Sequence, residues 1–192
     1  MLKKSIITMF GIIRWFRRNL FGIDERSPYN RALQNGLKSG DDVYVMGECF
    51  FDLGYPWLIE IGNRVTFAPR VCVLAHDAST KNKLGYSRVG KVKIGNDVFI
   101  GANVTILPGV TVGNNVIIGA GSVVSHSVPD NSVVAGNPAR KIKDYNVFML
   151  EQKKMMENSR VFDESYSLFS VVSCEKRTEM VDELEGGKCF VY

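Results

Sequence analysis

The clearest pattern in the chain is an apolar position that recurs every six residues. From Ile94, six consecutive hexapeptides begin at positions 94, 100, 106, 112, 118 and 124, and each begins with an aliphatic residue. The fifth position is valine in five of these six repeats, and the second is glycine in four of them. The same phase is visible upstream from Ile61 to Val73, and it blurs towards Val43. A period of six fits neither an α-helix nor a long β-strand.

A short strand followed by a tight corner explains this period. Triplets such as Val98–Ile100 and Val110–Val112 alternate apolar and outward-facing positions, as a strand with one buried face must. The three residues that follow often begin with glycine, which tolerates the backbone of a sharp corner. Three strands and three corners close an eighteen-residue triangular coil, and hexapeptide repeats are typical of parallel β-helices. An ordinary all-β domain would not keep this phase over 36 residues. We therefore expect an all-β fold, a parallel β-helix with helical appendages at both ends.

The phase is interrupted once. Counting sixes from Val73 predicts aliphatic residues at positions that hold Ser79, Gly85 and Lys91, and the repeat resumes at Ile94 out of step. The sequence therefore predicts that residues 77–91 are extruded from the coil as a polar loop. Loops carried by a rigid scaffold often hold binding residues.

His76 stands at the root of this predicted loop and is the first candidate for catalysis. A hydroxyl group is a poor nucleophile at neutral pH, and a neutral imidazole can remove its proton. The residues alone leave open that His76 is a surface histidine at a strand–loop junction. The chain has only two histidines, His76 and His126. Neither has a cysteine or carboxylate at metal-ligand spacing except Asp77, which as the next residue cannot easily share a ligand position with His76, so we predict no metal site.

The run from Ile61 to Lys143 resembles the hexapeptide-repeat acyltransferases. The motifs that carry the resemblance are LPGVTVG, from Leu107, and VVAGNPARKIK, which ends at Lys143. They are similar to those of the maltose, galactoside and capsular polysaccharide O-acetyltransferases. The resemblance implies a left-handed β-helix and acetyl-CoA as the acyl donor. It also implies that His76, which follows an APxV motif at residues 68–71, is the general base.

The same resemblance implies further site residues and an assembly. The positions that match the family's cofactor groove are Ala102, Ala120, Ser125, His126, Arg140 and Lys143. Small side chains let the pantetheine arm lie against the backbone, and cations attract the phosphates. From charge alone, the basic residues at the end of the coil could equally be a solvated cap. Asp77 and Tyr86 are candidates for substrate binding. The family assembles as homotrimers with active sites at the subunit interfaces, and we expect the same here.

The expected function is therefore acetyl-CoA-dependent acetylation of a hydroxyl of a sugar or of a cell-envelope or capsular polysaccharide precursor. Two alternatives are a streptogramin-type antibiotic O-acetyltransferase and a β-helix that serves as a scaffold without catalysis. The chain contains neither a GxxxxGK[ST] nor a GxGxxG motif, so nucleotide-dependent chemistry has no support.

The length of 192 residues, with 45% hydrophobic and 23% charged residues, fits one ordinary domain with short appendages. We expect a basic helical segment at 1–40, the β-helix at 41–143, and a helix and tail at 144–192. Four cysteines without CxxC spacing favour a reduced, cytoplasmic chain.

The positive charge is concentrated at the N-terminus, where residues 1–20 hold five basic side chains and no acidic one. This distribution does not indicate a nucleic-acid-binding surface. The apolar run at 5–13 is too short to span a bilayer. The segment is predicted to be a helix that either lies on an anionic membrane surface or packs against the protein.

Overall fold

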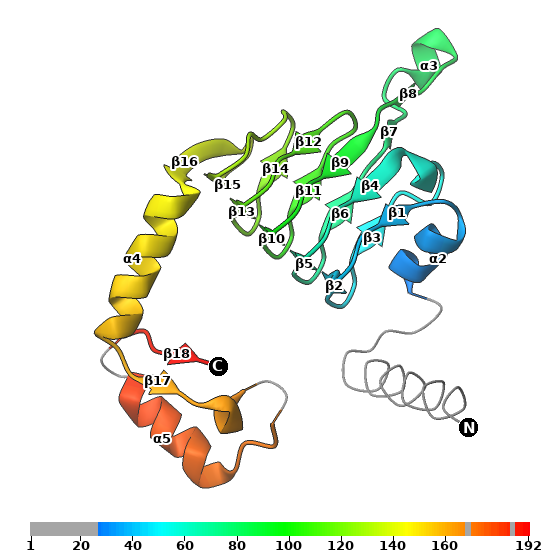
Figure 1. Cartoon of the computed structure of the whole chain (residues 1–192). Coiled ribbons are helices and arrows are strands. Elements are labelled where there is room, and N and C mark those ends of the chain that lie inside the picture. Colours follow the sequence, from blue (N-terminus) through cyan, green and yellow to red (C-terminus); the bar gives the residue numbers. More distant parts are fainter. Residues whose placement is uncertain (1–26, 168–169, 185–186) are drawn as a thin grey trace, which may run out of the picture. The chain divides into compact units, whose positions relative to one another are not determined.

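The computed structural model describes residues 27–167, 170–184 and 187–192. The chain forms two compact units, which divide after Tyr145. The coil of the first unit contains three sheets built from very short strands (Figure 1). The prediction for residues 1–20 lies outside the described residues. No helix in the described part of the chain is long and apolar enough to cross a membrane.

The three sheets of the first unit are here named A, B and C. Sheet A contains β1 (Lys38–Ser39), β4 (Ile59–Ile61), β9 (Val92–Ile94) and β12 (Thr111–Val112). Sheet B contains β2 (Tyr44–Val45), β5 (Val65–Phe67), β10 (Val98–Ile100), β13 (Val116–Ile118), β15 (Ser132–Ala135) and β16 (Arg140–Asp144). Sheet C contains β3 (Phe50–Phe51), β6 (Cys72–Val73), β11 (Thr105–Ile106) and β14 (Val123–Val124).

The chain visits sheets A, B and C in rotation, and each round forms one three-sided coil. All strand pairs within these sheets are parallel except β15 with β16, which is antiparallel. Ile100 pairs with Ile118, a spacing of 18 residues that matches the coil length predicted from the hexapeptides. The expectation of a mostly β fold with parallel sheets is therefore confirmed.

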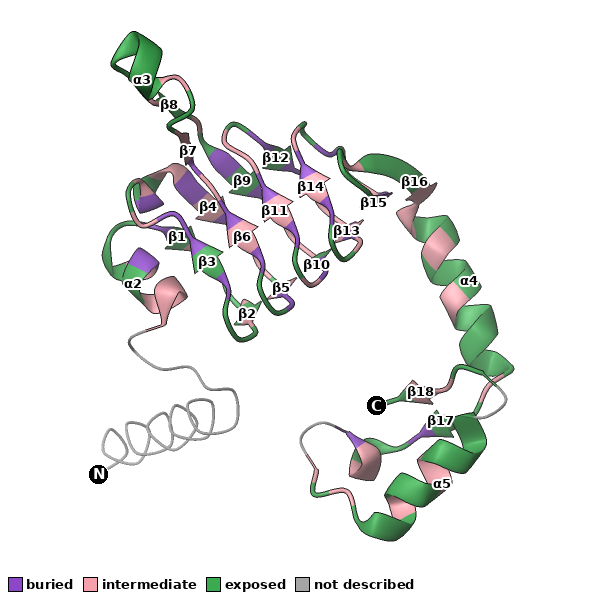
Figure 2. Cartoon of the chain, turned by 180° about the vertical axis from the view of Figure 1, so that it is seen from behind, coloured by how far each residue is buried: buried purple, intermediate pink, exposed green. Residues whose placement is uncertain are grey.

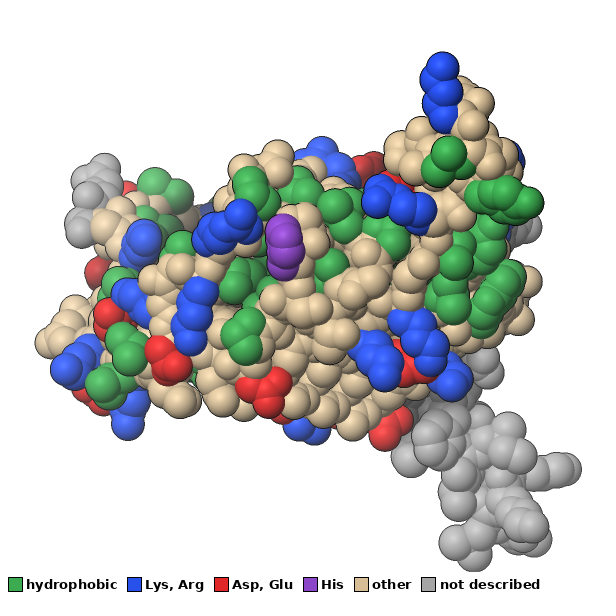
Figure 3. Space-filling model, turned by 90° about the horizontal axis from the view of Figure 1, so that it is seen from above, with side chains coloured by type: hydrophobic (Ala, Val, Ile, Leu, Met, Phe, Trp, Pro, Cys, Tyr) green, Lys and Arg blue, Asp and Glu red, His purple; other side chains and the backbone are tan. Residues whose placement is uncertain are grey.

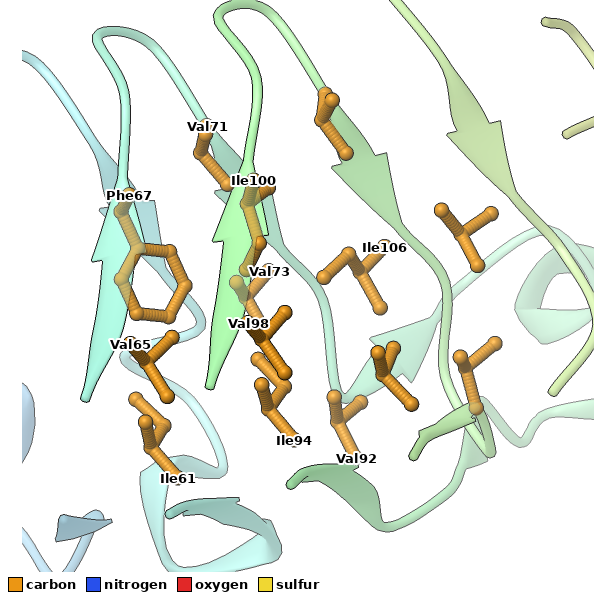
Figure 4. Close-up of a cluster of buried hydrophobic side chains, with 14 of the residues drawn as sticks. Ile61, Val65, Phe67, Val71, Val73, Val92, Ile94, Val98, Ile100 and Ile106 are labelled. Atoms are coloured by element: carbon orange, nitrogen blue, oxygen red, sulfur yellow. The ribbon is translucent and has the colours of Figure 1, made fainter. Parts of the chain in front are cut away.

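The aliphatic positions of the hexapeptides form the core of this unit. In β10, Val98 and Ile100 are buried and Phe99 between them is exposed, which is the alternation that a strand imposes. Figure 4 shows the side chains of successive coils pointing into a common interior. The burial colouring shows the same interior row along the strands (Figure 2). Buried apolar surface of this kind stabilises the stack from coil to coil.

Two insertions break the 18-residue spacing, and both lie at the corner between sheets C and A, here called the C–A corner. Ile61 pairs with Ser39, a spacing of 22 residues, because β3 and β4 are separated by a segment containing the 3₁₀ turn η1 (Pro56–Leu58). Ile94 pairs with Ile61, a spacing of 33 residues. This longer insertion contains β7 (His76–Asp77), α3 (Lys81–Leu84) and β8 (Arg88–Val89), and it projects from the coil (Figure 1).

Helix α2 (Pro28–Gln34) precedes the first coil and contacts β3. Its first turn is set by the Ser27 hydroxyl, which accepts a hydrogen bond from the backbone of Asn30, and by Pro28, whose backbone suits the first turn of a helix. Its Ala32 is fully buried in the core cluster.

The second unit is small and has its own packing. It contains α4 (Tyr145–Glu157), β17 (Val161–Phe162), η2 (Glu164–Tyr166), α5 (Cys174–Leu184) and β18 (Phe190–Val191). Phe162 is buried against the Tyr166 ring, with 4.8 Å between centroids. The Tyr166 hydroxyl donates a hydrogen bond to Glu179 on α5. These contacts fix η2 to α5.

Candidate active site

His76 lies where the chain leaves the coil to form the long insertion. It belongs to β7, which pairs with β8 in antiparallel register, His76 opposite Val89 and Asp77 opposite Arg88. The two strands make the base of a hairpin whose tip is α3. The His76 side chain is 37% exposed, so the imidazole is partly open to solvent and partly packed.

Asp52 lies on the preceding coil, immediately after β3, and its carboxylate contacts the imidazole of His76. Its side chain is 1% exposed. One oxygen, Oδ1, accepts a hydrogen bond from the backbone N–H of Gly54 at 3.0 Å. The other, Oδ2, accepts from the backbone N–H groups of Ala75 at 2.9 Å and His76 at 3.0 Å, and lies 2.5 Å from His76 Nδ1. The carboxylate therefore fixes both the backbone and the ring of His76.

The electrostatics of this pair determine which nitrogen of His76 is available. Burial acts to raise the pKa of Asp52, but the hydrogen bonds from His76 and from the backbone N–H groups of Ala75 and Gly54 outweigh it, so the pKa is lowered. An ionised carboxylate can only accept hydrogen bonds, so the proton at this contact belongs to Nδ1. In the neutral imidazole, the lone pair is then on Nε2. This is the tautomer that a histidine needs to act as a general base.

An aromatic pair starts at the imidazole, with Tyr55 against His76 and Trp57 against Tyr55. The Tyr55 ring is tilted against His76, with centroids 5.3 Å apart. The Trp57 indole meets Tyr55 edge to face at 5.7 Å. Both come from the shorter insertion between β3 and β4, so the two insertions of the C–A corner meet around His76.

The Asp77 side chain makes its contacts within the long insertion. Its carboxylate accepts a hydrogen bond from the Ser79 backbone at 2.8 Å and forms an ion pair with Arg88 across the hairpin. The Ser79 N–H first, and then the Arg88 guanidinium, lower the pKa of Asp77 to about 2. Tyr86, at the far end of the hairpin, is 80% exposed. These contacts assign Asp77 a role in shaping the hairpin.

The expected cofactor residues lie in three places. Ala102 and Ala120 are neighbours at the corner between sheets B and C, here called the B–C corner, where Gly121 N–H donates to Ala102 O at 2.8 Å. Ser125 and His126 follow β14 at the C–A corner, with 3.0 Å between Ser125 Oγ and His126 Nδ1. Arg140 and Lys143 are on β16, and Arg140 is exposed. Within one chain, the alanine pair and His76 thus occupy different corners of the coil.

The sequence pattern did not identify Asp52, Tyr55 or Trp57. All three lie in the region where the hexapeptide phase blurs, because the 22-residue spacing of the first two coils hides their alignment. The signal that could have found Asp52 is Phe51, which pairs with Val73 and places the next residue beside the loop root. Within residues 27–167, 170–184 and 187–192, no group of three histidine, cysteine or acidic side chains is arranged to hold a metal ion.

Comparison with known proteins identifies the repeat and its relatives. Residues 91–126 match the family model described as bacterial transferase hexapeptide (six repeats). The chain is 46% identical over 108 residues to Protein CapG of Staphylococcus aureus. This alignment covers 54% of this chain and 61% of that protein.

Two solved structures are also similar. One is a maltose O-acetyltransferase from Clostridium difficile 630, with 40% identity, a TM-score of 0.50, and coverage of 57% of this chain and 59% of that one. The other is a hexapeptide-repeat acetyltransferase from Vibrio cholerae O1 biovar eltor in complex with acetyl coenzyme A, with 29% identity, a TM-score of 0.52, and coverage of 57% and 61%.

The resemblance expected from the sequence, to hexapeptide-repeat acyltransferases of the sugar O-acetyltransferase type, is confirmed by these matches. The chain spans about three fifths of the length of the curated relatives it matches.

Proposed function

We propose that this protein is an acetyl-CoA-dependent O-acetyltransferase that acts on a hydroxyl of a sugar or of a cell-envelope or capsular polysaccharide precursor. The observation that carries the proposal is the Asp52–His76 pair, with its 2.5 Å contact, at a corner of a hexapeptide-repeat coil. The similar maltose O-acetyltransferase and the acetyl-CoA complex support the reaction class and the donor.

The geometry supports a direct transfer in which His76 moves the proton. Nε2 accepts the proton of the acceptor hydroxyl as its oxygen attacks the carbonyl carbon of the thioester. The imidazolium that forms is stabilised by the buried negative charge of Asp52. When the carbon–sulfur bond breaks, the same proton passes from Nε2 to the leaving thiolate. The products are an acetyl ester and a free thiol, and His76 is again neutral.

Acetyl-CoA is proposed to bind along the residues that match the family groove. Ala102 and Ala120 are stacked on neighbouring coils and carry only methyl groups, so an extended ligand can approach the backbone there. Arg140 and Lys143 on β16 would attract its phosphates as cations. Ser125 and His126 lie at the C–A corner and are assigned to the same ligand.

We further propose a homotrimer whose active sites are shared between chains, built on a left-handed β-helix as the family resemblance implies. Two faces of the coil support this assembly. The outward positions include Tyr44 and Phe99 on sheet B and Phe50 on sheet C, which are 46%, 46% and 43% exposed. The outward side of sheet A is instead polar, with Lys38 and Lys93 close to Glu60. Apolar faces exposed in one chain are typical of an interface between subunits.

A shared site also resolves the separation of the proposed groups. Ala102 and Ala120 are at the B–C corner, whereas His76 is at the C–A corner. A donor bound beside the alanines would therefore meet the His76 of a neighbouring copy more readily than its own.

The reaction is tested by thiol release from acetyl-CoA with a panel of sugars, nucleotide sugars and streptogramins, followed by mass analysis of the acceptor. We expect one or more sugars to gain one acetyl group for each thiol released. A streptogramin as the only acceptor would favour the antibiotic alternative. No release with any acceptor would contradict the proposal and favour a non-catalytic scaffold.

A further inference from the structure

Trp57 is open to solvent and contacts the Tyr55 ring that borders His76. Trp57 is 54% exposed, whereas tryptophan residues are highly buried on average. Figure 3 views the side of the molecule from which the long insertion projects, and hydrophobic side chains are exposed on this side. The Trp57 indole is therefore accessible to a ligand that also reaches Tyr55.

The backbone around Trp57 holds it in place. Pro56 is buried and starts the 3₁₀ turn that carries the indole. Gly36, with a φ of +101°, lies so close that an added Cβ would be 3.2 Å from Trp57 Cβ. Only glycine readily adopts this backbone while leaving room for the indole. The scaffold therefore constrains the backbone that carries Trp57, which lowers the cost of ordering this residue when a ligand binds.

The position of the pair relative to the base fixes what it can do. Tyr55 lies between His76 and Trp57, with centroid distances of 5.3 Å to the imidazole and 5.7 Å to the indole. An acceptor whose hydroxyl reaches His76 and whose body extends over Tyr55 would also meet Trp57. The face of an aromatic ring is electron-rich and attracts polarised C–H bonds. The C–H face of a sugar ring matches this surface in shape and charge.

We propose that Tyr55 and Trp57 form a stacking shelf for the sugar ring of the acceptor. The proposal rests on the function proposed above and adds the residues that select the acceptor. Trp57 acts as a binding residue for the sugar and takes no part in proton transfer. A shelf of two aromatic rings suits a neutral hexose ring, held by its apolar face with one hydroxyl directed to His76.

The test compares acceptor binding in Trp57→Ala and Trp57→Phe with the wild type, using the best acceptor from the panel. We expect Trp57→Ala to raise the acceptor KM roughly tenfold, since loss of an aromatic contact of this kind costs about one factor of ten in affinity. The KM for acetyl-CoA and the kcat should stay close to wild type. Trp57→Phe should recover most of the affinity. Tyr192→Ala removes an aromatic that is even more open, 82% exposed in the second unit, and serves as the control.

A binding measurement separates this proposal from the proposed function. The chain has two tryptophans, so Trp15→Phe leaves Trp57 as the only indole. Adding maltose or the best acceptor should change its fluorescence in a saturable way, with or without turnover. If the wild type transfers no acetyl group, the proposed function is wrong, and the fluorescence titration alone then tests whether Tyr55 and Trp57 bind a sugar. An unchanged acceptor KM in Trp57→Ala, a titration without any change, or a change in oligomeric mass in that variant would overturn the shelf.

Discussion

Replacing Asp52 with asparagine tests the pairing on which the mechanism depends. The carboxylate accepts four N–H groups, one on Oδ1 and three on Oδ2. An asparagine side chain has one oxygen and an NH₂ group that cannot accept. In its better orientation the oxygen replaces Oδ2, and the NH₂ then opposes the N–H of Gly54. In the other orientation three N–H groups lose their acceptor, and Nδ1 can no longer keep its proton at this contact.

The expected loss follows from these contacts. Without the negative charge the imidazolium is no longer stabilised, and in the second orientation Nε2 carries the proton and cannot act as a base. We expect kcat to fall by roughly 10²- to 10⁴-fold, the range seen when a positioned base or its carboxylate partner is removed. The opposed N–H of Gly54 should lower the free energy of unfolding by about 1–3 kcal/mol. Affinity for acetyl-CoA should not change.

The assay is thiol release at saturating acetyl-CoA, with denaturant unfolding measured in parallel. Asp97→Asn is the matched control, because Asp97 pairs with the exposed Arg64 at a different corner, between sheets A and B. That variant should keep wild-type turnover. If Asp52→Asn retains more than half of the wild-type kcat while folding normally, the Asp52–His76 pair does not drive the reaction.

Three further predictions concern the core, the hairpin and the assembly. Phe67→Ala should lower the free energy of unfolding by about 3–5 kcal/mol in denaturant titrations, because Phe67 is fully buried among successive coils; a loss below about 1 kcal/mol would contradict this packing. Because the folded pKa of Asp77 is lowered to about 2 from 3.8, its contribution to stability is present above pH 3.8 and is lost as the pH falls through about 2. Asp77→Asn should therefore make the hairpin that contains Arg88 exchange its amide hydrogens faster at neutral pH. Equal exchange rates in the variant and the wild type would show that the Asp77–Arg88 ion pair does not stabilise the hairpin. Co-expression of His76→Ala with Ala120→Trp, each inactive alone, should restore part of the activity in mixed trimers; mixed trimers of confirmed mass without activity would place the whole site within one chain.

The regular part of the fold could be predicted from the sequence because each aliphatic position repeats the same contact. Ile94, Ile100 and Ile106 are buried at the interval that the hexapeptide predicts. His76 was identified for a related reason, since the repeat breaks just after it. The left hand of the coil, the trimer and the groove residues remain predictions.

The partners of His76 could not be predicted because no local rule places them. Asp52 is 24 residues earlier and meets the imidazole only through the stacking of two coils. The insertion that carries Tyr55 and Trp57 shifts the first coil by four residues relative to the 18-residue repeat, as the pairing of Ser39 with Ile61 records. A repeat identified by its spacing can no longer be followed across such a shift. The strand pairing of the folded chain shows which residues of the two coils lie side by side.

The central claim, that His76 is the general base of an acetyl transfer, is tested most directly by the turnover of His76→Ala at saturating acetyl-CoA and acceptor. The account predicts a kcat lower than wild type by roughly 10²- to 10⁴-fold, with the Kd for acetyl-CoA unchanged, because the imidazole acts on the acceptor hydroxyl. A folded His76→Ala protein that keeps more than half of the wild-type kcat would contradict it.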